Sequence, residues 1–234
     1  MTTAIVLAGG LGTRLREAVS GLPKPMAPVN GRPFLEYLID YWIEQGVERF
    51  VMSVGYLHQH VVNHFGYCYK GVEIEYSVED SPLGTGGALL LASSKLNSNH
   101  PFLLLNGDTF FAVDLGQLID FSSGIRADWC LSIFQSSDQS RYLGLDLSSN
   151  GTIRSFNPSA PSDRKFVNGG VYLVHPNSLP QLAQSTKINI SLEQDIFPMA
   201  LKKGQNFVGL EFTGTFIDIG IPSDYQKAKF IFKS

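Results

Sequence analysis

The sequence lacks the features that mark secreted, membrane-spanning and nucleic-acid-binding proteins. Its 234 residues include only two cysteines, Cys68 and Cys130, which give neither a disulfide framework nor the spacing of a zinc site. No charged leader precedes the first apolar segment, and no apolar run approaches the roughly 20 residues that span a bilayer. The formal net charge is −3 and no basic cluster is present, which argues against nucleic acid as a main partner. We therefore expect a cytoplasmic protein that binds neither membranes nor nucleic acid.

Internal repeats, low-complexity tracts and linker-like segments are missing as well. Hydrophobic residues make up 44% of the chain and charged residues 17%, which is ordinary for a globular protein. A chain of this length fits one α/β domain. We therefore expect a single domain over residues 1–234.

The most informative stretch lies near the N-terminus. The apolar, β-branched run at 4–8 predicts a buried strand, and it leads directly into the glycine-rich segment 9–14, GGLGTR. Glycines after a strand allow a tight turn and let backbone N–H groups approach a ligand closely, which is a common way to bind phosphate. Arg14 and Lys24 add positive charge, and prolines at 23, 25 and 28 stiffen the segment that carries Lys24. This combination suits a polyphosphate ligand.

Two familiar glycine motifs are not present in this stretch. A P-loop requires a Lys-Ser or Lys-Thr pair after its glycines, and none follows here. The dinucleotide-binding fingerprint requires a third glycine where Leu15 stands. A dinucleotide-dependent dehydrogenase is therefore only a distant alternative.

Strands and helices alternate through the first half of the sequence. The period of the apolar residues predicts strands at 50–54, 72–78 and 102–105 and helices at 34–45, 56–65 and 84–96. Beyond residue 114 we expect strands at 128–134, 142–147, 152–156, 167–174, 207–212 and 215–219, and helices at 191–203 and 224–232. This order predicts an α/β, Rossmann-like fold with a central mixed, mostly parallel sheet. Ligands of such folds lie at the carboxyl ends of the strands.

Two aspartates directly follow apolar, strand-like segments. Asp108 ends the sequence Asn106-Gly107-Asp108, and Asp218 lies in FIDIGIP. A carboxylate at the end of a strand is suited to hold Mg²⁺ against phosphate oxygens, because Mg²⁺ binds one or two carboxylates together with phosphates and water. For either residue alone, a capping or turn role is the more ordinary explanation.

The N-terminal motifs together resemble a known signature. Residues 8–15 (AGGLGTRL) and 23–33 (PKPMAPVNGRP) resemble the sugar-1-phosphate nucleotidylyltransferases, the enzymes that make nucleotide sugars. The resemblance implies a nucleotidyltransferase fold and transfer of a nucleotidyl group to a sugar 1-phosphate with release of pyrophosphate. It also implies catalytic roles for Arg14, Lys24 and Asp108, and Mg²⁺ bound by Asp108 and Asp218, since the family's N-G-D and D-I-G-x-P motifs are both intact. The loop residues implied to bind the nucleotide are Leu7, Ala8, Gly9, Gly10, Gly12 and Thr13.

A second segment bears on the nucleobase. Residues 79–88 (EDSPLGTGGA) resemble the family's base-recognition segment, which implies that Glu79, Gly84 and Thr85 bind the nucleotide. Guanine presents two adjacent donors, N1–H and N2–H₂, that one carboxylate can accept together, whereas uracil and thymine present one N–H between acceptors and suit glutamine better. Glu79 therefore favours GTP as the substrate, unless it is a solvated loop carboxylate.

The second half contains segments that the resemblance connects with the sugar. Asn168 and Gly169 lie in NGGVY, which resembles the family's N-x-G-x-Y element. Glu193 stands where relatives carry an acidic residue near the sugar. A carboxylate in the first turn of a helix explains Glu193 equally well.

The sequence departs from the family at one functional position. Many members carry a Glu-Lys pair whose lysine contacts the sugar phosphate, but residues 156–161 (FNPSAP) contain no lysine. Arg154, Arg164 or Lys165 are candidates to replace it; otherwise the acceptor is bound more weakly or in a different arrangement. The departure keeps a second class of protein open, a catalytically poor homologue that binds nucleotide sugars.

Several segments are most similar to the guanylyltransferases that act on D-glycero-D-manno-heptose 1-phosphate. They are SGLPKPMAP, YSVEDSPLGTGGA, NGDTFF and FIDIGIPSDY. The expected reaction is GMP transfer from GTP to this heptose 1-phosphate, with a uridylyl- or mannose-1-phosphate-type enzyme as the alternative. We assign residues 1–113 to a nucleotide-binding half and residues 114–234 to a sugar-phosphate-binding half. A homo-oligomer is compatible with the sequence.

Overall fold

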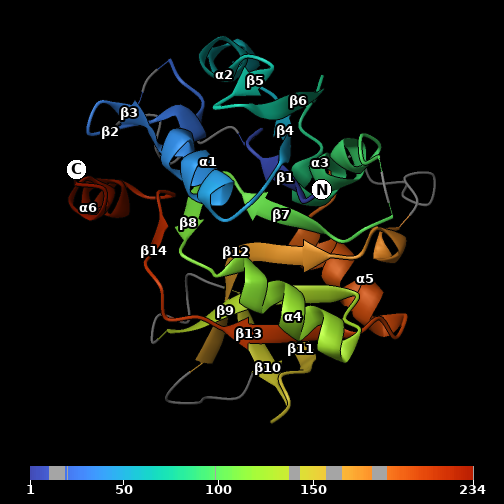
Figure 1. Cartoon of the computed structure of the whole chain (residues 1–234). Helices are drawn as coiled ribbons and strands as arrows, with labels where there is room; N and C mark the ends of the chain where they lie inside the picture. The colour runs from blue at the N-terminus through green and yellow to red at the C-terminus, as the bar shows by residue number, and fades with distance from the viewer. Residues whose placement is uncertain are drawn as a thin grey trace.

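The fold is built on one large mixed sheet. The computed structural model describes residues 1–10, 19, 21–97, 99–136, 143–156, 165–180 and 189–233. Within these residues, ten strands form a sheet in the order β11-β10-β12-β7-β1-β4-β6-β5, with β9 paired to β12 and β13 paired to β9 (Figure 1). The strands are β1 (Thr3–Leu7), β4 (Arg49–Val54), β5 (Cys68–Tyr69), β6 (Val72–Val78), β7 (Phe102–Asn106), β9 (Trp129–Ser136), β10 (Gly144–Leu147), β11 (Ile153–Phe156), β12 (Lys165–Val174) and β13 (Phe207–Glu211).

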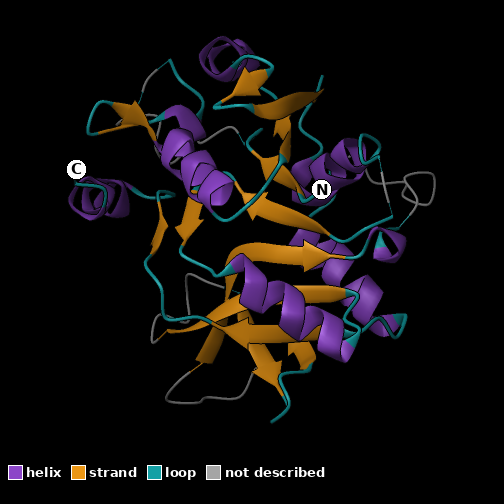
Figure 2. Cartoon of the chain, in the orientation of Figure 1, coloured by secondary structure: helices purple, strands orange, loops and turns teal. Residues whose placement is uncertain are grey.

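Helices cover both faces of this sheet (Figure 2). Successive side chains of a strand point to opposite faces, so in β1 Ala4 and Val6 join one core while Ile5 joins the other. The first core contains residues of α1, α2, α4 and α6, and the second contains residues of α3, η4 and α5. The helical segments are η1 (Lys24–Met26), α1 (Phe34–Glu44), α2 (His58–Phe65), α3 (Gly84–Ser93), α4 (Leu115–Ile125), η2 (Pro176–Ser178), the π-helical η4 (Leu192–Ile196), α5 (Phe197–Lys202) and α6 (Pro222–Ile231).

The predicted α/β fold with a mixed central sheet is confirmed, but its parallel part is confined mainly to the first half. β1 pairs in parallel with β4 and β7, and β4 with β6. β12, by contrast, pairs antiparallel with β7, β9 and β10, and β10 pairs antiparallel with β11. The tight turn at Asn150-Gly151 joins β10 to β11, where a crossover helix would be needed for parallel strands.

One helix of the structure is not indicated by the sequence pattern, and two helical segments were predicted as one. No element was predicted at 115–125, where α4 lies, because Gly116 and Gly124 are poor helix formers. The helix is stabilised by Asp114, which caps it by accepting the Gln117 N–H at 2.8 Å. The helix expected at 191–203 consists of η4 followed by α5, and Ser191 accepts the Gln194 N–H as a cap. Among the described residues, none of the helices has both the length and the apolar character required to cross a membrane.

Two small ribbons lie beside the sheet, and the first of them joins distant parts of the chain. β8 (Thr109–Phe111) pairs with β14 (Phe216–Asp218), and β2 (Pro28–Val29) pairs with β3 (Arg32–Pro33). α6 follows β14 and packs on the second ribbon, where Asn30 Nδ2 donates to the Lys229 carbonyl at 2.9 Å and Tyr225 donates to the Pro28 carbonyl. The segment that follows Lys24 is therefore held by the last helix (Figure 1).

Candidate active site

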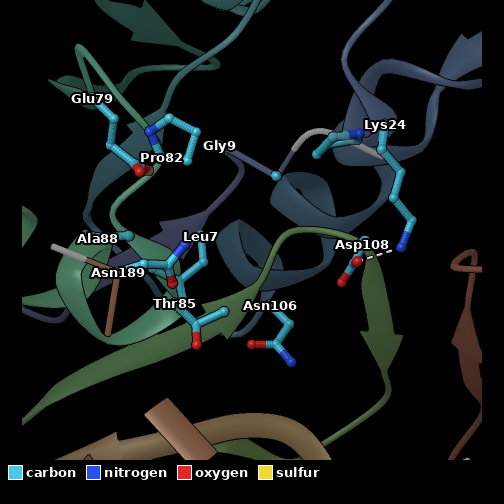
Figure 3. A pocket seen from close by; sticks show the side chains of 13 residues that line it. Leu7, Gly9, Lys24, Glu79, Pro82, Thr85, Ala88, Asn106, Asp108 and Asn189 are labelled. Carbon is cyan, nitrogen blue, oxygen red and sulfur yellow. Dashed lines mark hydrogen bonds and ion pairs between the residues drawn. The ribbon is translucent and has the colours of Figure 1, made fainter. Parts of the chain in front are cut away.

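Four strand ends meet at one edge of the sheet. Because β1, β4, β6 and β7 are parallel, their carboxyl ends, followed by Gly9, Gly55, Glu79 and Asp108, lie on the same side. A cavity of about 450 Å³ opens at this edge, a size that suits a small-molecule ligand. Figure 3 shows Glu79 at one end of the cavity and Lys24 with Asp108 at the other. The cavity therefore has an acidic end and an end where a lysine meets a carboxylate.

Many of the predicted site residues line this cavity. They are Leu7, Gly9, Gly10, Lys24, Glu79, Gly84, Thr85 and Asp108. Ala8 is buried instead, and its N–H donates to the Ser53 carbonyl at 2.8 Å. Gly12, Thr13 and Arg14 lie outside the described residues, so their roles stay predictions.

The cavity is also lined by residues that the sequence did not assign to the site. They are Pro25, Pro82, Ala88, Asn106 and Asn189. Asn106 begins the Asn-Gly-Asp segment, so its position at a strand end was a usable signal. Asn189 packs against Gly84, where a Cβ would overlap its Oδ1. This contact joins segments that are far apart in the sequence, so no local pattern predicts it.

At the acidic end, the carboxylate of Glu79 is held from three sides. Ser53 Oγ donates to Glu79 Oε1 at 3.2 Å, and the Leu83 N–H donates to Oε2 at 3.1 Å. Gly9 lies directly beside the carboxylate, because a Cβ at this position would overlap Oε1 unless the Glu79 side chain shifted. Glu79 is half-buried and is thus a fixed acceptor at the cavity wall, not a freely solvated loop residue. That it binds a base stays a prediction.

At the other end, one lysine joins two aspartates. Lys24 Nζ pairs directly with Asp108 Oδ2 and lies 3.8 Å from Asp218 Oδ1. The β8–β14 ribbon brings the two carboxylates together, since Asp218 is in register with Thr109, the residue after Asp108. The Gly220 N–H donates to Asp218 Oδ1 at 2.6 Å and fixes this carboxylate further. The sequence predicted both aspartates, and the ribbon shows how they reach one place.

The two aspartates fit a magnesium site. A single cation, the Lys24 ammonium, already reaches both carboxylates, so a metal ion placed between them could do the same. Among the residues that the structure describes, no group of three or more His, Cys, Asp or Glu side chains forms a potential metal site. Two carboxylates alone leave most of the octahedral shell open, and Mg²⁺ fills that shell with phosphate oxygens and water. The donor set therefore fits a metal that binds together with a phosphate ligand.

The predicted sugar residues surround a buried tyrosine near the cavity. Asn168 Nδ2 donates to Tyr172 Oη at 2.7 Å, and Asn106, which lines the cavity, also hydrogen-bonds Tyr172. Burial raises the pKa of Tyr172 far above its ordinary value, and the negative charge of Glu193 adds to the effect. Gly169 is buried, and a Cβ there would overlap the ring of Phe111. Asn168 thus lies next to the cavity, whereas Gly169 serves close packing.

Glu193 connects η4 to the start of α3. Thr85 Oγ1 donates to Glu193 Oε2 at 3.3 Å, and the Leu192 N–H donates to Thr85 Oγ1 at 2.8 Å. Glu193 also lies in the first turn of η4, as the alternative explanation expects. Of the candidates to replace the missing lysine, Arg154 is exposed on β11, while Arg164 and the side chain of Lys165 lie outside the described parts of the chain.

Comparison with known proteins matches the chain to one family. The Nucleotidyl transferase family model matches residues 3–233. The chain is 38% identical over 226 residues to the D-glycero-alpha-D-manno-heptose 1-phosphate guanylyltransferase of Aneurinibacillus thermoaerophilus, covering 97% of this chain and 96% of that protein. It is 36% identical over 222 residues to the enzyme of the same name from Campylobacter jejuni, covering 95% of this chain and 96% of that protein.

A solved structure agrees with the sequence matches. HddC from Yersinia pseudotuberculosis, determined in complex with GMP-PN, superposes with a TM-score of 0.84 at 31% identity and covers 100% of both chains. The family model and these relatives span almost the whole chain, which confirms the resemblance indicated by the N-terminal motifs. This protein therefore belongs to the nucleotidyl transferase family.

Proposed function

We propose that this protein transfers GMP from GTP to D-glycero-α-D-manno-heptose 1-phosphate and releases pyrophosphate. The observation that carries the proposal is the polarity of the cavity, with the acceptor pair of Glu79 at one end and Lys24 with Asp108 at the other (Figure 3). A nucleoside triphosphate lying along the cavity would place guanine on Glu79 and its phosphates at Lys24. The names of the two relatives and the nucleotide in the HddC structure support the choice of guanine and heptose.

The chemistry requires positioning more than proton transfer. An oxygen of the sugar phosphate attacks the α-phosphorus in line, and pyrophosphate leaves, so no covalent enzyme intermediate is needed. Lys24 is half-buried and held by two carboxylates, and its ammonium would meet the α-phosphate as charge shifts onto the phosphate oxygens. Arg14 would stabilise the β- and γ-phosphates as pyrophosphate departs. Gly9, Gly10 and Gly12 would let the backbone approach the triphosphate.

Asp108 and Asp218 are the residues that would hold Mg²⁺. The ion, when bound, neutralises charge on the donor and acceptor phosphates. Because Lys24 pairs with the same carboxylates, a bound metal ion would compete with the ammonium for them. Displacement would leave Lys24 available for the α-phosphate.

The remaining assignments follow from this placement. Residues 1–113 would contribute the base and triphosphate contacts, and residues 114–234 would contribute Asn168 and Glu193 on the acceptor side, with Gly169 packing behind them. The cytoplasm as the compartment and a homo-oligomer as the assembly stay predictions from the sequence. One observation favours a second candidate, a nucleotide-sugar-binding protein with little activity: residues 156–161 lack the lysine that many family members use for the sugar phosphate.

A release assay tests the proposal. Pyrophosphate release would be measured with Mg²⁺ for GTP, UTP, CTP, dTTP and ATP, each with D-glycero-α-D-manno-heptose 1-phosphate and with mannose 1-phosphate. We expect turnover with GTP and the heptose, and its near-complete loss in Lys24→Ala. Turnover with UTP or dTTP alone would keep the mechanism and contradict the base assignment. GTP binding without pyrophosphate release would support the binding protein instead.

A further inference from the structure

Ser53 is a buried hydroxyl next to the cavity that the reaction scheme does not use. It lies in β4, in register with Leu7 of β1 on one side and Ser77 of β6 on the other. Its side chain is 0% exposed, and its Oγ donates to Glu79 Oε1 at 3.2 Å. A buried hydroxyl is costly without a partner, so this contact with the cavity wall fixes the positions of both residues.

The hydrogen bonds leave the Glu79 carboxylate with a defined set of open positions. A carboxylate has about four acceptor positions, two on each oxygen. Ser53 uses one on Oε1 and the Leu83 N–H uses one on Oε2. Because one donor binds each oxygen, the group cannot rotate without losing both contacts. Each oxygen retains a second acceptor position.

We propose that Ser53 is a positioning residue that makes the enzyme select guanine by its N2 amino group. With the carboxylate fixed, Oε1 and Oε2 accept N1–H and N2–H₂ at the same time. A carboxylate free to rotate would still accept N1–H, which hypoxanthine also carries, but would hold the second, geometry-dependent bond poorly. The inference rests on the proposed transfer of GMP and identifies which atom of the base is selected.

The test compares GTP with ITP, which lacks only the N2 amino group. kcat/KM for both nucleotides would be measured by pyrophosphate release in wild type, Ser53→Ala and Ser77→Ala. Ser77 is the matched control: it is 1% exposed, lies in register with Ser53, and its Oγ has no hydrogen-bond partner among the described residues. We expect wild type to prefer GTP about ten-fold or more, and Ser53→Ala to lose about five-fold of that preference while Ser77→Ala keeps it. Thermal unfolding of each variant checks that the fold is intact.

Each other result has a definite meaning. A wild-type GTP-to-ITP ratio in Ser53→Ala, or an equal loss in Ser77→Ala, overturns the inference. Equal use of GTP and ITP by wild type also overturns it, because N2 is then not read, while GMP transfer stands. A lower kcat with both nucleotides at an unchanged ratio indicates a structural role for Ser53 and counts against positioning. Turnover with UTP but not GTP contradicts the proposed function itself, and the inference falls with it.

Discussion

Replacing Lys24 by methionine should tighten the binding of a divalent ion while it abolishes turnover. In wild type, an ion that binds Asp108 and Asp218 must displace Nζ, which pairs with the first and lies 3.8 Å from the second. Hydrogen bonds to charged groups contribute about 1.5–3 kcal/mol. The side chains of Asp108 and Asp218 are 37% and 26% exposed, and the solvent around them favours the lower end of that range. About 1.4 kcal/mol is a ten-fold change in affinity, so we expect Lys24→Met to bind Mn²⁺ about ten- to thirty-fold more tightly.

The assay follows free Mn²⁺ by electron paramagnetic resonance during titration of the nucleotide-free protein. Lys202→Met is the control, because it removes one positive charge from an exposed position of α5, on the other helical layer. That variant should bind Mn²⁺ like wild type. Pyrophosphate release by Lys24→Met should fall about a hundred-fold or more, since the α-phosphate loses its charge partner. Mn²⁺ affinity equal to or weaker than that of wild type would refute the displacement argument.

Three further predictions concern single groups. Glu79→Gln presents an amide donor where guanine needs acceptors, so the ratio of kcat/KM for GTP over UTP should fall about ten- to a hundred-fold; an unchanged ratio would contradict the base assignment. Tyr172→Phe removes the hydroxyl to which Asn168 donates, so KM for the sugar phosphate should rise about three- to ten-fold at constant KM for GTP. If both constants rise together in initial-rate kinetics, the effect is not on the acceptor side. Burial raises the pKa of Cys130 to about 12, so at mildly alkaline pH its thiol stays protonated and unreactive toward a disulfide reagent, whereas the exposed Cys68 reacts. Two rapidly reacting thiols in the native protein would be inconsistent with this burial.

Local sequence patterns predicted the parts of the site that lie directly after strands. Glycine and carboxylate residues just beyond apolar runs gave Gly9 and Asp108, because the strand period and the strand-end rule both act over short distances. Glu79 was indicated by the resemblance of residues 79–88 to the family's base-recognition segment. The parallel order of β1, β4, β6 and β7 then brought these positions to one edge. Elements formed by long-range pairing were harder to predict.

Local sequence patterns could not predict the antiparallel pairing of the second half or the long-range contacts that support the site. β12 changes partner along its length and carries a register shift between Asn168 and Tyr172, which a period-2 pattern does not encode. In the sequence, Ser53 is only a small residue within a predicted strand. Its hydrogen bond to Glu79 depends on the pairing of β4 with β6, which the local pattern does not show. Asn189 reaches the cavity through a contact with Gly84 that no sequence pattern indicates.

The packing of α6 against the β2–β3 ribbon has a consequence for synthesis on the ribosome. The Glu79 carboxylate and the groups around it, from Gly9 to Leu83, are all present once residues 1–83 have emerged. The Lys24 end of the cavity is complete only after Asp218 and α6 have been synthesised. The contact between α6 and Asn30 joins residues 199 positions apart. Contacts of such long range form late in folding. A nascent chain can therefore assemble the Glu79 wall of the cavity well before the Lys24 end is complete, so we expect incomplete chains to lack the transfer activity.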